Sequence, residues 1–185
     1  MMLPTAENDF LMIWVGSPWW FWLLIAVIAY FCGCFNGAVI VSKYILRDDV
    51  RKHGSGNAGL TNFYRTFGGP LTLVVILTDV LKAVVAIWIA ADIVNSPFLA
   101  VVLAKYWAGL WCLLGHMFPC MFHFKGGKGI LSGGAIAIMI DWRIALVVWG
   151  GFLILAVFDP VCVPGLLLGR RLLSLCYLVC VSQRG

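Results

Sequence analysis

Apolar residues occupy most of the chain, in long runs that short polar segments interrupt. A helix needs roughly 20 consecutive apolar residues to cross a bilayer, and several runs approach or exceed this length. The clearest runs cover residues 22–44, 71–93, 98–118 and 130–158, and a weaker run covers 161–181. This pattern predicts an all-α fold, a polytopic membrane bundle with about five or six apolar segments.

The last two runs are less regular than the others. Asp141-Trp142-Arg143 interrupts residues 130–158, which favours two short helices over one long tilted span. Arg170 and Arg171 lie inside residues 161–181. Each arginine would cost at least about 2.5–3.5 kcal/mol at the centre of a bilayer, so this run is poorly suited to span a membrane.

The composition agrees with a membrane protein. Apolar residues make up 63% of the 185 positions and charged residues 11%, against about 45–50% and about 25% in soluble domains. The net charge of +5 could indicate a nucleic-acid partner. The basic residues cluster in short loops, however, and the positive-inside effect accounts for them better. We therefore expect no nucleic-acid partner.

The distribution of basic residues predicts how the spans are oriented. The first ten residues carry acids but no base, whereas residues 43–65 are rich in Lys and Arg. This contrast places the N-terminus outside and the loop after the first span in the cytoplasm. The connection at 92–97 has no Lys or Arg, and the loop at 119–129 returns to the cytoplasm with Lys125 and Lys128. Both glycine-rich loops are therefore expected on the cytoplasmic side.

The longest polar run, residues 51–65, has three glycines within six positions. Converging N–H groups of a glycine-rich backbone form an anion site, so the run predicts an anion-binding loop; a plain flexible loop is the alternative. The run matches G-x-G-x-x-G, but a membrane span precedes it where the dinucleotide fold needs a strand. Thr61 or Asn62 is expected to cap a short helix that reaches Phe67. The candidate residues are Gly54, Ser55, Gly56, Asn57, Gly59, Thr61, Asn62 and Arg65.

A second glycine-rich loop, Lys125-Gly126-Gly127-Lys128-Gly129, precedes the fourth apolar run. It is not a P-loop, because Phe122 and Gly129 stand where that motif needs Gly and then Ser or Thr. Glycine N–H groups and two lysines at the start of a helix can still bind phosphate, so this loop is also predicted to bind an anion. The alternative is an ordinary positive-inside loop, which would need the lysines but not the glycines.

Three polar side chains within the apolar runs are further candidates. Asp79 and Lys82 are three residues apart and share a helix face, so they form either a structural ion pair or part of a site. His116 either makes an interfacial hydrogen bond to backbone or belongs to a site. Neither His116 nor His123 has an acidic neighbour in sequence, and the seven cysteines lack metal-ligand spacing. We therefore expect no metal site.

These motifs resemble the acyl-phosphate glycerol-3-phosphate acyltransferases of bacterial membranes, the PlsY family. The matching segments are residues 51–62 with Arg65, Asp79-x-x-Lys82, residues 115–119 and residues 124–129. The resemblance implies transfer of a fatty acyl group from acyl phosphate to the 1-hydroxyl of glycerol 3-phosphate, giving lysophosphatidic acid and phosphate in phospholipid biosynthesis. It further implies that Ser55 and Arg65 are the catalytic pair, and that the other residues of both loops, with Lys82 and His116, bind substrate.

The same resemblance implies a multi-pass protein of the bacterial plasma membrane whose active face is cytoplasmic. Glycerol 3-phosphate, acyl phosphate and membrane lipid are the implied partners, and the pattern does not specify an oligomeric state. No cofactor is expected, because acyl phosphate is already activated. The alternative from another class is a non-catalytic membrane binder or transporter of small phosphorylated solutes.

The C-terminal part departs from the family pattern. The family has a third motif there with serine, histidine, asparagine and glutamate, whereas this chain has no His after His123, no Asn after Asn95 and no Glu after Glu7. We expect the resemblance to end near Asp159, which divides the chain into an acyltransferase-like membrane domain, 1–158, and an atypical tail, 159–185. We interpret the tail as truncated or frame-shifted, and expect the chain of 185 residues to be inactive or nearly so.

Overall fold

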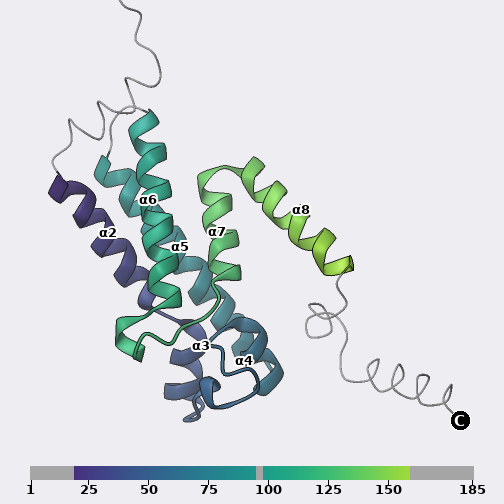
Figure 1. Cartoon of the computed structure of the whole chain (residues 1–185). Helices are drawn as coiled ribbons and strands as arrows, with labels where there is room; N and C mark the ends of the chain where they lie inside the picture. The colour runs from purple at the N-terminus through teal and green to yellow at the C-terminus, as the bar shows by residue number, and fades with distance from the viewer. Residues whose placement is uncertain (1–18, 95–97, 159–185) are drawn as a thin grey trace, which may run out of the picture.

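The computed structural model describes residues 19–94 and 98–158, and within these ranges all regular structure is helical. Helices α2, α5 and α6 lie side by side, α7 packs against α5 and α6, and α8 packs against α7 and turns away from the others (Figure 1). The elements are α2 (Trp19–Cys34), α3 (Gly37–Ile40), the π-helical turn η1 (Val41–Ile45), the 3-10 turn η2 (Val50–Lys52), α4 (Leu60–Thr66), α5 (Leu71–Val94), α6 (Phe98–Met117), the 3-10 turn η3 (Cys120–Phe122), α7 (Ile130–Ile140) and α8 (Trp142–Phe158).

Small residues allow the helices of the bundle to approach closely. A Cβ on Gly33 of α2 would collide with the backbone of Cys112 in α6, and a Cβ on Gly115 would collide with the backbone of Tyr30. Glycine and alanine at such contacts replace bulky side chains with direct backbone packing, as is common between membrane helices. The main core cluster contains Trp22, Ile25, Ala29, Ala83, Ala86, Ile87, Ala90, Ala104, Ala108, Cys112, Ala135 and Ile136.

Two helices of the described residues, α5 and α6, are long and apolar enough to cross a membrane. They confirm the helices predicted at 71–93 and 98–118 to within one residue at each end. The bent pair of α2 and residues 37–45 would add a third span if it counts as one. The described part of the molecule therefore has two or three candidate spans, and the run at 161–181 lies outside the described residues.

The first predicted span differs from the structure. Its helix begins at Trp19 and stops at Cys34, and the chain then bends by 41° before it continues at Gly37. Asn36 causes the interruption, because its backbone is extended and its side chain accepts a hydrogen bond from the N–H of Val39, which caps α3. Hydropathy alone predicts one helix over this run and misses the interruption at Asn36.

The predicted break at Asp141 is confirmed. Helix α7 ends at Ile140, α8 begins at Trp142, and the backbone of Asp141 between them is extended. The Asp141 carboxylate accepts a hydrogen bond from the N–H of Arg143, which satisfies one free donor of the first turn of α8. Two helices meeting at an angle therefore replace one long span.

The polar segments gather at one end of the bundle. Helices α3 and α4 lie there, beside the loop that joins α6 to α7 (Figure 1). A separate apolar cluster anchors α4: the Phe63 side chain is fully buried with Ala38, Val41, Val50 and Val75. This small core fixes the first glycine-rich loop, which runs between η2 and α4, against the membrane helices.

Candidate functional site

Asn62 organises the first glycine-rich loop from inside. Its amide Nδ2 lies 3.0 Å from each of three carbonyl oxygens, those of Val50, His53 and Asn57. Its Oδ1 accepts a hydrogen bond from the N–H of Ser55 at 3.1 Å. The side chain is almost fully buried, so the loop is folded around one amide group.

The expected helix cap is wrong. Helix α4 begins at Leu60, after Gly59, which takes the N-cap position without a side-chain hydrogen bond. Thr61 and Asn62 therefore lie inside the first turn rather than at the cap. The sequence pattern misplaced the start because Asn62, a good capping residue, turns back onto the loop instead.

The outer face of this loop is open to solvent. Gly54 and Gly56 adopt positive φ angles of 55° and 70°, which turn the chain sharply on both sides of Ser55. Ser55 is exposed, and so are Thr61 and Arg65, which lie one turn apart on α4. The N–H of Ser55 is engaged by Asn62. The hydroxyl of Ser55 and the guanidinium of Arg65 therefore remain as the groups that could meet a ligand.

The second loop differs from expectation in how its glycines are used. The N–H of Gly126 donates to the carbonyl of Met117 at 3.1 Å, and the N–H of Gly127 donates to that of His116 at 3.2 Å. These two N–H groups are therefore engaged within the protein and are not free for an anion, contrary to the prediction that glycine N–H groups of this loop bind one. A Cβ would collide with the backbone of His116 and Met117 at Gly126, and at Gly127 would lie 2.7 Å from the carbonyl oxygen of Ala58. Glycine is required here because the loop lies directly against α6 and the first loop.

Lys125 and Lys128 are exposed, and Gly129 takes a positive φ of 75° immediately before α7. Gly129 is the N-cap of α7 and offers no side-chain cap. The first N–H groups of α7 consequently have no partner within the helix. Positive charge and helix N-terminus therefore adjoin, as a phosphate site requires.

The two loops, which the sequence predicts only to share one side of the membrane, are in direct contact. The N–H of Ala58 donates to the carbonyl of Gly126 at 3.4 Å, and Asn36 Nδ2 donates to the carbonyl of Ala58 at 3.0 Å. Arg51 Nη1 donates to the carbonyls of Phe122 at 2.8 Å and Lys125 at 3.3 Å. The two motifs thus form one polar surface.

Sequence reasoning missed that Asn36 and Arg51 link the two loops. A signal for Asn36 was present, since it is an amide in an apolar run, and it is fully buried. Arg51 also forms a two-pronged ion pair with Asp49, with the shortest contact at 2.6 Å. The hydrogen bond from Arg51 holds the pKa of Asp49 below its usual range, although burial acts in the opposite direction. Arg51 is therefore fixed on one side by Asp49 and bridges to the second loop on the other.

Asp79, Lys82 and His116 form a buried polar cluster where α5, α6 and the bend of the first span meet. Lys82 Nζ lies 2.7 Å from Asp79 Oδ1 and 2.6 Å from His116 Nδ1, and donates to the carbonyl of Phe35 at 3.1 Å. Asp79 also accepts a hydrogen bond from the N–H of Gly37. Asp79 and Lys82 do form an ion pair, one of the two alternatives that their spacing left open, and His116 joins it as a third member of the cluster.

The interfacial hydrogen bond to backbone, one of the two alternatives for His116, is not the contact that its Nδ1 makes. That nitrogen pairs with Lys82 instead. The acidic neighbour that the local sequence lacks comes from α5, where Asp79 Oδ1 lies 3.8 Å from His116 Nδ1 and binds the same Lys82 ammonium. All three side chains are at most 6% exposed. Helix packing brings His116 to this pair from 34 residues beyond Lys82, which no local pattern could show.

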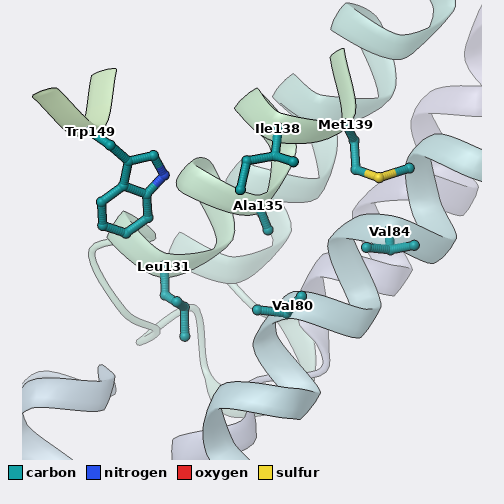
Figure 2. A pocket seen from close by; sticks show the side chains of 7 residues that line it. All are labelled: Val80, Val84, Leu131, Ala135, Ile138, Met139 and Trp149. Atoms are coloured by element: carbon teal, nitrogen blue, oxygen red, sulfur yellow. The ribbon is translucent and has the colours of Figure 1, made fainter. Parts of the chain in front are cut away.

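An apolar hollow of about 150 Å³ lies between α5, α7 and α8 (Figure 2). The side chain of Leu131, in the first turn of α7, lines it close to the second loop, and Trp149 of α8 forms another wall. The lining residues are Val80, Val84, Leu131, Ala135, Ile138, Met139 and Trp149. Its walls are hydrocarbon almost throughout, which suits an apolar ligand.

The fold and these contacts define a helical membrane protein with two joined polar loops at one end of an apolar bundle. Residues 23–181 match the family model described as glycerol-3-phosphate acyltransferase, and the chain belongs to this family. The match continues past Asp159, where the motif comparison predicted that the resemblance ends. The boundary at residue 158 stays a prediction.

Curated relatives and solved structures agree with this membership. The chain is 36% identical over 129 residues to the glycerol-3-phosphate acyltransferase of Photorhabdus laumondii, covering 69% of this chain and 56% of the relative. It is 41% identical over 131 residues to that of Mycoplasmopsis agalactiae, covering 64% of this chain and 54% of the relative. The chain thus spans little more than half the length of these relatives.

Two crystal structures of PlsY, an integral membrane glycerol 3-phosphate acyltransferase, resemble the fold. The glycerol 3-phosphate form has a TM-score of 0.63 and the lysophosphatidic acid form a TM-score of 0.60. Both are 28% identical in sequence, and each comparison covers 75% of this chain and 66% of the PlsY chain. The helical membrane architecture is therefore that of the family.

Proposed function

We propose that this protein transfers a fatty acyl group from acyl phosphate to the 1-hydroxyl of glycerol 3-phosphate. The observation that carries the proposal is the joint between the two family motifs, in which Ala58 contacts Gly126 and Arg51 binds the carbonyls of the second loop. The joint supports one binding surface with exposed Ser55, Arg65 and Lys128. Two phosphate-bearing substrates need such a concentration of donors.

The chemistry needs positioning more than a strong base. The 1-hydroxyl oxygen forms a bond to the acyl carbon, the bond from that carbon to phosphate oxygen breaks, and the hydroxyl proton passes to the departing phosphate. Arg65 would hold a phosphate with its planar fork, and the Ser55 hydroxyl would donate to a substrate oxygen. Lys125 and Lys128 would hold glycerol 3-phosphate. Holding both reactants in line supplies much of the rate enhancement.

The apolar hollow supports a place for the acyl chain. Leu131 follows Gly129 by two residues, so the hollow begins within one turn of the second loop. An apolar hollow of about 150 Å³ is large enough to hold a small apolar group, such as a short stretch of hydrocarbon chain. The rest of the chain would lie in the bilayer, and the active face would be the cytoplasmic face of the bacterial plasma membrane.

The reaction is tested in membranes that contain the protein in two forms. One is the chain of 185 residues, and the other is a chimera whose residues from 159 onward come from the Photorhabdus relative. Membranes with the chimera should convert radiolabelled glycerol 3-phosphate to lysophosphatidic acid with acyl phosphate, without ATP and with a chelator present. A requirement for acyl-CoA, or no product from either form, would overturn the proposal.

The role of Arg65 is tested in the form that is active. Arg65→Lys keeps the charge but loses the planar fork, so the maximal rate should fall by about tenfold or more, while the exposed control Lys43→Met should match the parent. Equal activity of Arg65→Lys and the parent would show that Arg65 contributes only a positive charge that orients the loop in the membrane.

A further inference from the structure

His116 connects the buried ion pair to the second loop. Its Nδ1 lies 2.6 Å from Lys82 Nζ. On its other edge, a Cβ built on Gly127 would lie 2.5 Å from His116 Nε2, and one built on Gly129 would lie 3.5 Å from Cδ2. One edge of the imidazole therefore faces Lys82 and the other faces the loop around Lys128.

Lys82 determines which ring nitrogen carries the proton. An ammonium group has three donors and no acceptor, so the His116 nitrogen 2.6 Å away must accept. A lone pair on Nδ1 leaves the ring proton on Nε2. Asp79 holds Lys82 in place at 2.7 Å. The cluster thus presents an Nε2–H donor toward Gly127 and Gly129.

This donor has no hydrogen-bond partner among the described residues. The His116 side chain as a whole is 97% buried, but Nε2 is not one of the fully buried unpaired atoms and so keeps some accessible surface beside the loop. An unpaired donor at such a site costs free energy unless a ligand or water satisfies it. The N–H groups of Gly126 and Gly127 already donate to carbonyls. The donors left at this place are His116 Nε2–H, the exposed Lys128 ammonium and the uncapped first turn of α7. All three suit an anion.

We propose that His116 donates a hydrogen bond from Nε2 to the substrate phosphate at Gly127–Gly129, and that Lys82 is the positioning residue that holds the required tautomer. The inference rests on the proposed function, in which that phosphate belongs to glycerol 3-phosphate. In this proposal the buried charges Asp79 and Lys82 contribute to recognition of the substrate phosphate, as well as to the contact between α5 and α6.

The first test measures binding of glycerol 3-phosphate, and separately of inorganic phosphate, to the detergent-solubilised chain by titration calorimetry. His116→Gln places an amide donor near the position of Nε2, whereas the shorter His116→Asn places it near Nδ1. The Asn variant should bind glycerol 3-phosphate about 10- to 100-fold more weakly, as expected for a lost hydrogen bond to a charged group. The Gln variant should stay within about threefold of the parent.

Lys128→Met should weaken binding, and Lys43→Met, an exposed lysine outside both loops, should not. Equal affinities for His116→Asn and the parent would overturn the inference, even if acyl transfer is found. No binding of either anion by the parent would overturn it as well, and would also remove the second loop from substrate binding. The acyl-transfer assay is separate, so its failure and the failure of this inference are distinguishable.

The second test needs no variant at the histidine. Nitrogen NMR of the parent, labelled at its histidines and assigned with His116→Gln, should show a protonated Nε2 and an unprotonated Nδ1. The paired change Asp79→Asn with Lys82→Met leaves no lone buried charge, and it should produce a mixture of tautomers and weaker anion binding. A parent ring protonated at Nδ1, or an unchanged ring and affinity in the paired variant, would overturn the positioning role.

Discussion

At the scale of single residues, the interior of the first loop depends on Asn62 more than on its glycines. Four hydrogen bonds converge on this one side chain. The sequence identifies it only as one polar residue among several. Its importance follows from burial, which makes an unpaired donor or acceptor expensive.

Asn62→Asp separates the two halves of that network. The variant keeps the acceptor for the N–H of Ser55 but turns a carboxylate oxygen toward the carbonyls of Val50, His53 and Asn57. It should lower the free energy of unfolding by about 1–3 kcal/mol and make the loop sensitive to protease. Thermal unfolding in detergent measures the change, with the exposed Thr61→Val as control. A variant as stable as the parent would show that the loop does not depend on this amide.

Asp49 predicts how the loop responds to acid. The hydrogen bond from Arg51 lowers the pKa of Asp49 in the folded protein, so its contribution to stability is present above the unfolded pKa of about 3.9 and is lost as pH falls through the folded pKa. At neutral pH the parent should therefore exceed Asp49→Asn in stability by about 1 kcal/mol. The difference should shrink below about pH 4. Unfolding curves from neutral to acid pH that run parallel for the two proteins would contradict this.

At the scale of elements, hydropathy predicted the helices well where the residues that end a helix are neighbours in the sequence. Helices α5 and α6 are bounded by glycine and proline or by polar residues, and the charged break at Asp141 is visible in the sequence. The bend at Asn36 was not predictable in the same way, because its side chain caps α3 and binds the carbonyl of Ala58 from a distant loop. The cluster of Asp79, Lys82 and His116 likewise needs α5 and α6 to be packed first.

The packing of η3, in the segment between α6 and the second loop, against α2 can be tested through two cysteines. Cys34 Sγ, at the end of α2, lies 3.8 Å from Cys120 Sγ in η3, and a disulfide needs about 2.05 Å, within reach of small side-chain rotations. Mild oxidation with diamide should produce an intramolecular Cys34–Cys120 disulfide that mass spectrometry detects. Cys120→Ser should abolish it, and the buried Cys112 should stay reduced. Failure to form it in the folded protein would show that η3 lies elsewhere.

Filling the hollow between α5, α7 and α8 tests its proposed use. Ala135 lies in its wall and is 7% exposed, so Ala135→Phe would occupy space expected for methylene groups. In the active form, the ratio of kcat/KM for long to short acyl phosphates should fall by about tenfold. Leu73→Phe, on the exposed face of α5, serves as control. An unchanged ratio would place the acyl chain elsewhere.

At the scale of the whole molecule, two independent lines place the glycine-rich loops on one side. The charge pattern counts lysines and arginines against spans, whereas the structure joins the loops by hydrogen bonds from Ala58 and Arg51. The charge pattern predicts that this side is the cytoplasm, whereas the hydrogen bonds require only that the two loops lie on the same side. Their agreement constrains the number of crossings between the loops to an even number.

The cytoplasmic placement is tested by single cysteines in a cysteine-free background, labelled in intact cells with an impermeant maleimide. Cysteines at His53 and at Lys125 should both be protected until the cells are permeabilised, because basic loops stay in the cytoplasm. A cysteine at Asp92, exposed near the end of α5, should be labelled without permeabilisation. Labelling of both loops with protection of Asp92 would invert the topology and leave the packing intact. Labelling of only one loop would contradict the contact between Ala58 and Gly126 as well, because hydrogen-bonded loops cannot lie on opposite sides of a bilayer.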